Sequence, residues 1–150
     1  MSDVISTDRR LTGPQRAVLD ALLDTLLPAS EDGVMPSAAQ VDFNAYLSMQ
    51  AEDFIPELIS TLQHFDVSFA GLSLAERCQR VSDFSTANPE QFQSLLMHVY
   101  DCYYQNDRVR AQIGVVAGAP FPQGHQVTPG DLSLLDPVIE NSARHRYRKV

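Results

Sequence analysis

The sequence contains few of the patterns from which a nucleotide, haem or metal site is usually recognised. It has only two cysteines, Cys78 and Cys102, which are too few and too far apart for a disulfide framework or a cysteine-based metal site. Neither the G-x-G-x-x-G pattern nor a P-loop occurs, and C-x-x-C-H is absent as well. Both cysteines fall in helical patterns, where we expect small buried side chains.

Histidines are also scarce. None of the four, His64, His98, His125 and His145, is part of an H-x-x-x-H, H-E-x-x-H or E-x-x-H pattern, although zinc and di-iron sites need several ligands at such spacings. We expect His98 to be a hydrogen-bonded packing residue and His64 to lie near a helix end, where positive charge is favourable.

Candidates for acid–base or nucleophilic catalysis are weak. Asp20 and Asp24 are spaced i, i+4 and could form an acid pair, but a solvated helix face is the preferred interpretation. Composition leaves a Ser–His–Asp or Cys–His set open, yet no nucleophile lies in a recognisable elbow. We therefore expect no catalytic residue, no cofactor and no metal ligand in this chain.

Long apolar runs are missing too. No window approaches 18 consecutive apolar residues, so no membrane insertion is expected. Arg9 and Arg10 form a twin arginine, but no hydrophobic stretch follows, and we read no export signal. The expected location is cytoplasmic, and periplasmic only if a partner carries the signal.

Charge is distributed unevenly along the chain, which has a net charge of −8. The first 140 residues are acidic, whereas the last ten carry Arg144, Arg146, Arg148 and Lys149 and no acid. An acidic body argues against nucleic acid as a partner, because that affinity comes mainly from Lys and Arg on phosphates. The basic end is either a solvated tail or a docking element.

Apolar residues at helical spacing dominate the first 113 residues. They predict helices over 13–27, 38–50, 54–65, 74–86, 89–105 and 107–113. Start signals precede four of them: Thr12 with Gln15, Ser37 with Gln40, Ser73 with Glu76, and Asn88-Pro89 ahead of Gln91. No period-two alternation competes, so the fold class is all-α, a compact bundle of about five to six helices.

Three apolar faces are predicted in detail. The face of 13–27 combines two rows, Val18, Leu22 and Leu26 beside Leu19, Leu23 and Leu27. The face of 74–86 consists of Leu74, Cys78, Val81 and Phe84. The face of 89–105 consists of Phe92, Leu95, Leu96, Val99, Tyr100 and Tyr103.

Residues 114–150 differ from the rest, which divides the chain into a helical domain, 1–113, and a C-terminal arm. Four glycines and four prolines exclude a long helix there. Apolar residues persist nonetheless, from Val115 to Ile139, which is untypical of pure disorder. The arm could wrap its own domain, lie on another protein, or do both.

Three stretches resemble the gluconate 2-dehydrogenase subunit 3 family, the small or gamma subunits of sugar and polyol dehydrogenases. They are LTGPQRAVLDALLDTLLP at 11–28 followed by VDFNAYL at 41–47, YYQNDRV at 103–109, and APFPQGHQ at 119–126 followed by LLDPV at 134–138. The likeness covers nearly the whole chain in the family's order. Many members carry a twin-arginine signal, and this chain departs from them in that respect.

The resemblance implies a non-catalytic accessory subunit. Such subunits look free of cofactor and bind a large FAD-containing subunit of the glucose-methanol-choline oxidoreductase family, helping it to fold, load flavin or be exported. A hetero-oligomer with that flavoprotein is therefore expected.

The candidate partner-binding residues are Tyr103, Tyr104, Arg108, Pro120, Phe121, Pro122, His125 and Tyr147. Aromatic anchors commonly dominate interfaces. For Tyr103 a core position is the stronger reading, because it continues the helical stripe, whereas Tyr104 lies off it. Two alternative functions stay open: a stand-alone helical adaptor that binds through the arm, and a small metal-binding protein using His64, His98 and nearby carboxylates.

Overall fold

The computed structural model describes residues 11–115 and 130–142, the last two of these without their side chains. All regular structure in these ranges is helical, which confirms the all-α fold class. The chain divides into two units, Met1–Gly118 and Ala119–Val150, whereas the sequence analysis put the boundary after Ile113. Each unit is described by itself.

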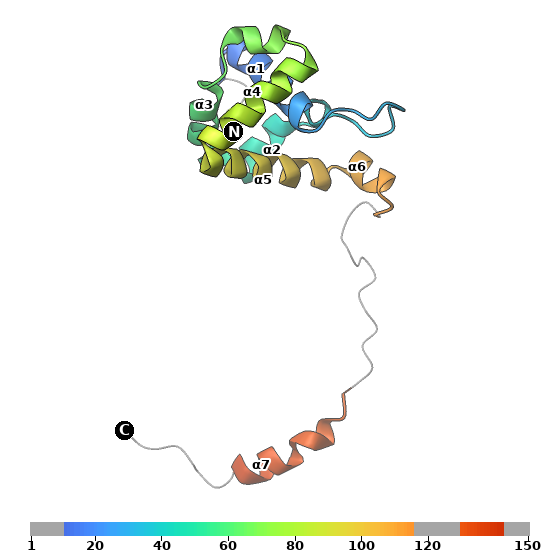
Figure 1. Ribbon diagram of the computed structural model, residues 1–150. Coiled ribbons are helices and arrows are strands. Elements are labelled where there is room, and N and C mark those ends of the chain that lie inside the picture. The colour runs from blue at the N-terminus through green and yellow to red at the C-terminus, as the bar shows by residue number, and fades with distance from the viewer. Residues whose placement is uncertain (1–10, 116–129, 143–150) are drawn as a thin grey trace, which may run out of the picture. The chain divides into compact units, whose positions relative to one another are not determined.

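The helical unit contains six α-helices in its described part (Figure 1). They are α1 (Gly13–Leu26), α2 (Phe43–Gln50), α3 (Ile55–Leu62), α4 (Leu74–Ala87), α5 (Pro89–Gln105) and α6 (Asp107–Gln112). Three short 3-10 helices connect them: η2 (Ala38–Gln40), η3 (Glu52–Phe54) and η4 (Val67–Gly71). The second unit contains η5 (Leu132–Leu135), which leads directly into α7 (Asp136–Ser142).

Local capping signals explain most of the helix starts. The boxes predicted at Thr12 and Ser73 both form; the backbone N–H of Ser73, for example, donates to a carboxylate oxygen of Glu76 at 2.9 Å. At Asn88 the prediction is wrong, because its side chain caps nothing. Asn88 instead ends α4 by donating its backbone N–H to the carbonyl of Phe84, and Pro89 begins α5 without needing a donor.

Two predicted helices are shorter in the structure. The segment 38–50 splits into η2 and α2 because Asp42 starts a new helix by accepting from the N–H of Ala45 at 2.9 Å. In the segment 54–65, α3 covers only Ile55–Leu62 and follows directly after η3, with Pro56 in the first turn of α3, where its missing N–H costs little. The remaining predicted helices agree with the structure to within a residue.

One hydrophobic core holds the helical unit together. Each of α1, α2, α3 and α5 contributes a fully buried leucine: Leu22, Leu47, Leu58 and Leu95. Burying a side chain of this kind stabilises a fold by about 1.5–3 kcal/mol relative to leaving it exposed. The four helices are therefore fixed to one another, and α5 extends along one side of the unit (Figure 1).

The buried face of α4 differs from the predicted one. Val81 and Phe84 are buried as expected, but Leu74 and Cys78 are exposed. The position that faces α1 is Arg77, whose guanidinium donates to the carbonyl of Ala21 at 2.9 Å. The inward row is thus 77, 81 and 84, which shares its last two positions with the predicted row and has Arg77 in place of Leu74 and Cys78.

The second unit contains helical structure that the sequence analysis did not anticipate. Glycine and proline density was expected to exclude a long helix, and α7 is indeed short, with Pro137 in its first turn. Asp131 begins η5 by accepting from the backbone N–H of Ser133 at 3.1 Å. The arm is therefore not uniformly extended.

Candidate functional site

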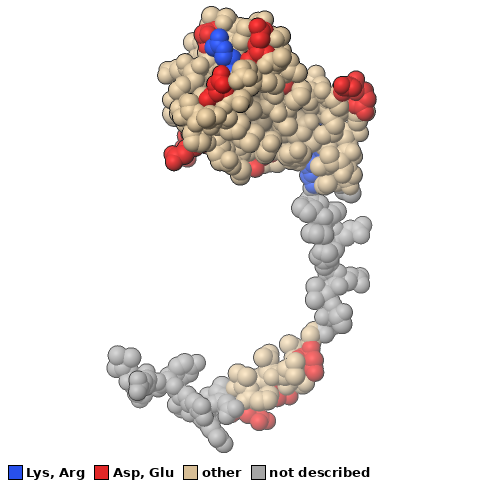
Figure 2. Space-filling view, viewed as in Figure 1, with Lys and Arg blue, Asp and Glu red and all other residues tan. Residues whose placement is uncertain are grey.

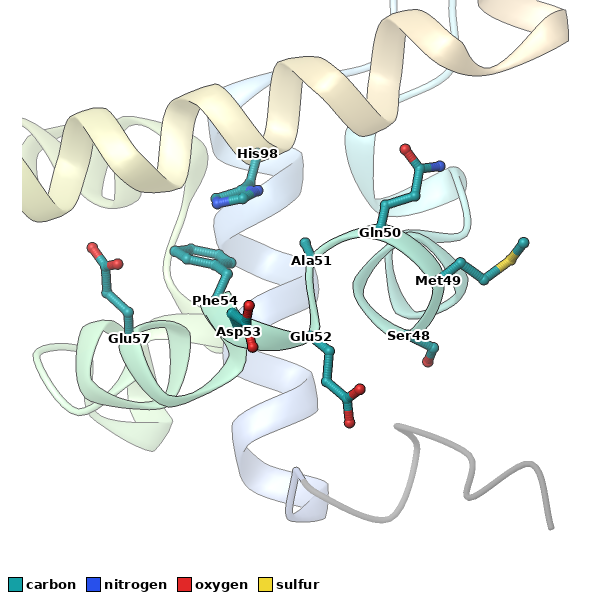
Figure 3. Close-up of a pocket in the computed structure, with 9 residues that line it drawn as sticks. All are labelled: Ser48, Met49, Gln50, Ala51, Glu52, Asp53, Phe54, Glu57 and His98. Carbon is teal, nitrogen blue, oxygen red and sulfur yellow. The ribbon is translucent and has the colours of Figure 1, made fainter. Parts of the chain in front are cut away.

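A pocket lies beside His98, between the end of α2 and the start of α3 (Figure 3). Its volume is about 550 Å³. The lining residues are Ser48, Met49, Gln50, Ala51, Glu52, Asp53, Phe54, Glu57 and His98. The chain turns at Ala51, which ends α2 by donating its N–H to the carbonyl of Leu47, and this turn opens the pocket.

His98 forms one wall of this pocket and is held firmly. Its ring stacks on the buried ring of Phe54, with the centroids 4.0 Å apart (Figure 3). Its Nδ1 shares a hydrogen bond of 2.8 Å with the hydroxyl of Tyr46, and burial raises the pKa of that phenol, with further contributions from Asp101 and Cys102. The prediction of a hydrogen-bonded packing histidine is confirmed.

The chemistry of the pocket is acidic but lacks a nucleophile–base pair among its lining residues. Three carboxylates line it, Glu52, Asp53 and Glu57, together with no Lys or Arg, so it favours a cation over an anion. The hydroxyl of Ser48 donates to the carbonyl of Asn44 at 2.9 Å instead of to His98. A Ser–His pair of the kind that activates a nucleophile is thus not formed here.

The histidines of the metal-binding alternative are not brought together. His64 lines a different pocket, with Arg80 and Asp83, and its ring packs against Phe84 with centroids 5.1 Å apart. In the parts of the chain that the structure describes, no group of three His, Cys, Asp or Glu side chains could hold a metal ion. A joint site of His64 and His98 therefore has no support.

Asp20 and Asp24 have different surroundings. Asp24 forms an ion pair with Arg77 at 3.1 Å, which ties α1 to α4. Asp20 has a raised pKa, because partial burial outweighs the opposing charge of Arg16. Asp24 is therefore a structural residue, and the two carboxylates do not act as a pair.

The structure separates the two tyrosines proposed as partner contacts. Tyr103 is only 3% exposed, and its hydroxyl donates to the carbonyl of Pro36 at 2.7 Å. It is a core residue, so the proposal of Tyr103 as a partner contact is wrong for this conformation. Tyr104 is 48% exposed and meets Tyr103 edge-on, with centroids 5.3 Å apart. It stays a candidate.

Two further side chains extend the surface around Tyr104. Met97 and Tyr100 are exposed on α5, and the ring of Tyr100 lies edge-on to that of Tyr104 with centroids 6.0 Å apart. The sequence analysis placed Tyr100 in the core and did not single out Met97. Positions 97, 100 and 104 lie on one face of a helix, and this spacing is the sequence signal from which Met97 and Tyr100 could have been predicted as surface residues. Met97, Tyr100 and Tyr104 are called the α5 surface below.

Of the other predicted contacts, only Arg108 is described. It is exposed and lies at the start of α6, where its guanidinium donates to the carbonyl of Gly33 at 3.4 Å. Pro120, Phe121, Pro122, His125 and Tyr147 lie outside the described residues.

Exposed apolar side chains are concentrated in the second unit. Leu132, Leu134, Leu135, Val138 and Ile139 are between 50% and 76% exposed. They occupy η5 and the first half of α7. This run, residues 131–142, is called the arm helix below.

Acidic residues predominate across the described surface. Residues 11–115 contain fourteen Asp and Glu against five Arg, and the arm helix contains Asp131, Asp136 and Glu140 and no base. Figure 2 shows this excess of acid on the visible face. Among the residues with described structure, no helix has the length and apolar character needed to cross a bilayer.

Comparison with known proteins gives no match: no family model fits the chain, and no curated protein or solved structure is significantly similar to it.

Proposed function

We propose that this chain is a non-catalytic small subunit that binds a large FAD-dependent dehydrogenase of the glucose-methanol-choline family and stabilises or matures it. The flavin and the oxidation of a sugar or alcohol belong to the partner. The likeness of 11–28, 103–109 and 119–126 to gluconate 2-dehydrogenase subunit 3 proteins motivates this choice of partner. The proposed complex is cytoplasmic unless the flavoprotein carries an export signal.

The α5 surface is the observation that carries the binding role. Met97, Tyr100 and Tyr104 lie on one side of the longest helix, and all three are substantially exposed. Tyrosine and methionine are enriched at protein interfaces. Tyrosine offers a large contact area at low cost in conformational entropy, and methionine adapts its shape to the partner surface. An aromatic surface on a helix that the core holds rigid suits a preformed binding face.

The rigidity of this face follows from the contacts behind it. Tyr103, next to Tyr104 in sequence, is fixed by its hydrogen bond to Pro36, and Val99 and Leu95 are buried on the same inner side of α5. The side chains of the α5 surface therefore project from a helix that is already ordered before a partner binds. Little conformational entropy is lost when a partner covers them.

Expression of a glucose-methanol-choline family flavoprotein from the same organism, with and without this chain, tests the proposal. We expect a soluble, yellow and active enzyme only when this chain is present. Tyr104→Asp should reduce the yield of yellow complex at least tenfold, whereas Ala75→Asp, which adds the same charge at an exposed position of α4, should not. A flavoprotein that is equally soluble, flavin-loaded and active without this chain would contradict the proposal.

A further inference from the structure

The arm helix has a two-sided pattern. Across the junction of η5 and α7, Leu134 and Val138 are spaced i, i+4, and Leu135 and Ile139 form a second such pair beside them. This repeats the double row that buries α1. In α1 that face is covered by the core, whereas in the arm helix the corresponding side chains are at least half exposed.

Such a short helix depends on packing. The run from Leu132 to Ser142 makes about three turns and is shorter than the roughly 12–15 residues at which isolated helices become stable in water. Most helical stability in proteins comes from burying an apolar face. The arm helix is therefore built to be covered by another surface, in the way that amphipathic helices enter apolar grooves with anchors at i, i+3, i+4 and i+7.

Charge indicates the kind of surface. Asp136 and Glu140 form an i, i+4 row separate from the rows that begin at Leu134 and Leu135, and no Lys or Arg lies within 131–142. A groove that accepts this helix should have basic residues on its rim. The helical unit of this chain has fourteen acidic residues and five arginines between residues 11 and 115, so it is acidic where a basic rim is needed. The helical unit of a second copy is acidic in the same way.

The basic residues from Arg144 to Lys149 follow the arm helix in sequence. They could favour an anionic membrane, but the three carboxylates of the helix would offset much of that attraction. Membrane-surface helices carry Lys and Arg on their polar face, and this helix carries only acid there. A protein groove is therefore the better fit.

We infer that the arm helix is an anchor that docks in an apolar groove with a basic rim on the flavoprotein partner. This inference rests on the proposed function and adds to it the segment that binds and the chemistry of the surface it meets. The fifteen steps from Val115 to Gly130 span at most about 50 Å when extended. One partner can thus engage both the α5 surface and the arm helix, and the second contact then forms at raised effective concentration.

The test starts from the co-expressed complex of the flavoprotein with a fluorescently labelled full-length chain, and it measures affinity as the concentration at which each unlabelled full-length chain displaces the labelled one. The double variant Leu135→Ala/Val138→Ala should bind at least 30-fold more weakly, the loss expected when a central apolar anchor is truncated. The matched control is Leu74→Ala, which truncates an exposed leucine on α4, outside the proposed contact, and should stay within twofold of the unaltered chain.

A second pair of measurements tests the basic rim. Raising NaCl from 0.05 to 0.5 M, about one decade, should weaken binding of the unaltered chain, because added salt screens the ion pairs. Asp136→Asn/Glu140→Gln should bind more weakly at low salt and respond less to added salt. An equal salt response in both proteins would overturn the basic rim.

The outcomes separate this inference from the proposed function. If Leu135→Ala/Val138→Ala binds the flavoprotein as tightly as the unaltered chain, the anchor is overturned while the proposed function stands. If the unaltered chain does not bind the flavoprotein, both fail. Binding of the chain to phosphatidylserine vesicles, lost in the same double variant, would overturn the protein groove in favour of a membrane.

Discussion

Replacing Tyr103 by phenylalanine removes one oxygen and leaves the ring in place. That oxygen donates to the carbonyl of Pro36 at 2.7 Å, and both residues are buried, so water has no easy access to the carbonyl that loses its donor. A buried polar group left without a partner costs about 1–3 kcal/mol. We expect the free energy of unfolding to fall by about 1–2 kcal/mol.

Thermal and urea unfolding, followed by circular dichroism, measure this loss. For a domain of this size, 1 kcal/mol corresponds to about 4–8 °C in the melting temperature. The midpoint in urea should fall while the slope m stays the same, because the surface exposed on unfolding is unchanged.

Tyr104→Phe is the matched control, since the neighbouring tyrosine loses the same oxygen from an exposed ring. Its stability should change by less than about 0.5 kcal/mol. If the two variants melt at the same temperature, Tyr103 is not the core residue described here, and its assignment as a partner contact would have to be reconsidered.

Three shorter predictions concern other side chains. Burial raises the pKa of Cys102 to about 11, so Ellman's reagent at pH 8 should label exposed Cys78 rapidly and Cys102 only after unfolding; equal rates would contradict this. Among the residues that the structure describes, none forms a hydrogen bond with the buried hydroxyl of Thr61, so Thr61→Val should leave stability unchanged or raise it by about 1 kcal/mol, and a clear loss in a thermal melt would refute it. Hydrogen bonds from Ser68 lower the pKa of Asp66, and those from Ser73 lower that of Glu76, so both stabilise the fold above their ordinary pKa of about 4 and lose this effect as the pH falls. Asp66→Asn/Glu76→Gln should therefore show a smaller loss of stability between pH 5 and pH 3, and an unchanged acid titration would refute this.

Helix bounds were predictable where the signal is local. The capping boxes at Thr12 and Ser73 join residues three apart, and Pro89 marks the start of α5 by itself. Such bonds form within one turn of chain and need no tertiary partner. The bounds of α4 and α5 follow directly from them.

The direction in which each helix faces was less predictable. Arg77 faces α1 only because Asp24 and the carbonyl of Ala21 lie there, more than fifty residues away in sequence. On α5, apolar residues cover more than one side, and the neighbouring helices decide that Tyr103 is buried and Tyr100 exposed. Hydrophobic periodicity along the sequence alone cannot predict which side of α5 is buried.

The pocket beside His98 could not be read from sequence for the same reason. His98 meets Tyr46 and Phe54 across two helices, and no spacing along the chain encodes that meeting. The arm helix, by contrast, left a usable signal. Between Asp131 and Ser142 there is no glycine, and Pro137 stands where a first turn tolerates it. The composition of the whole arm concealed this short regular stretch.

Native mass spectrometry of the chain co-expressed with a glucose-methanol-choline family flavoprotein from the same organism, together with a visible absorption spectrum of the same sample, tests the central claim most directly. The account predicts one species that contains both chains, with the flavin bands near 370 and 450 nm (roughly the values of free flavin, set by the cofactor itself). Recovery of this chain alone and colourless, beside a flavoprotein that assembles without it, would contradict the claim.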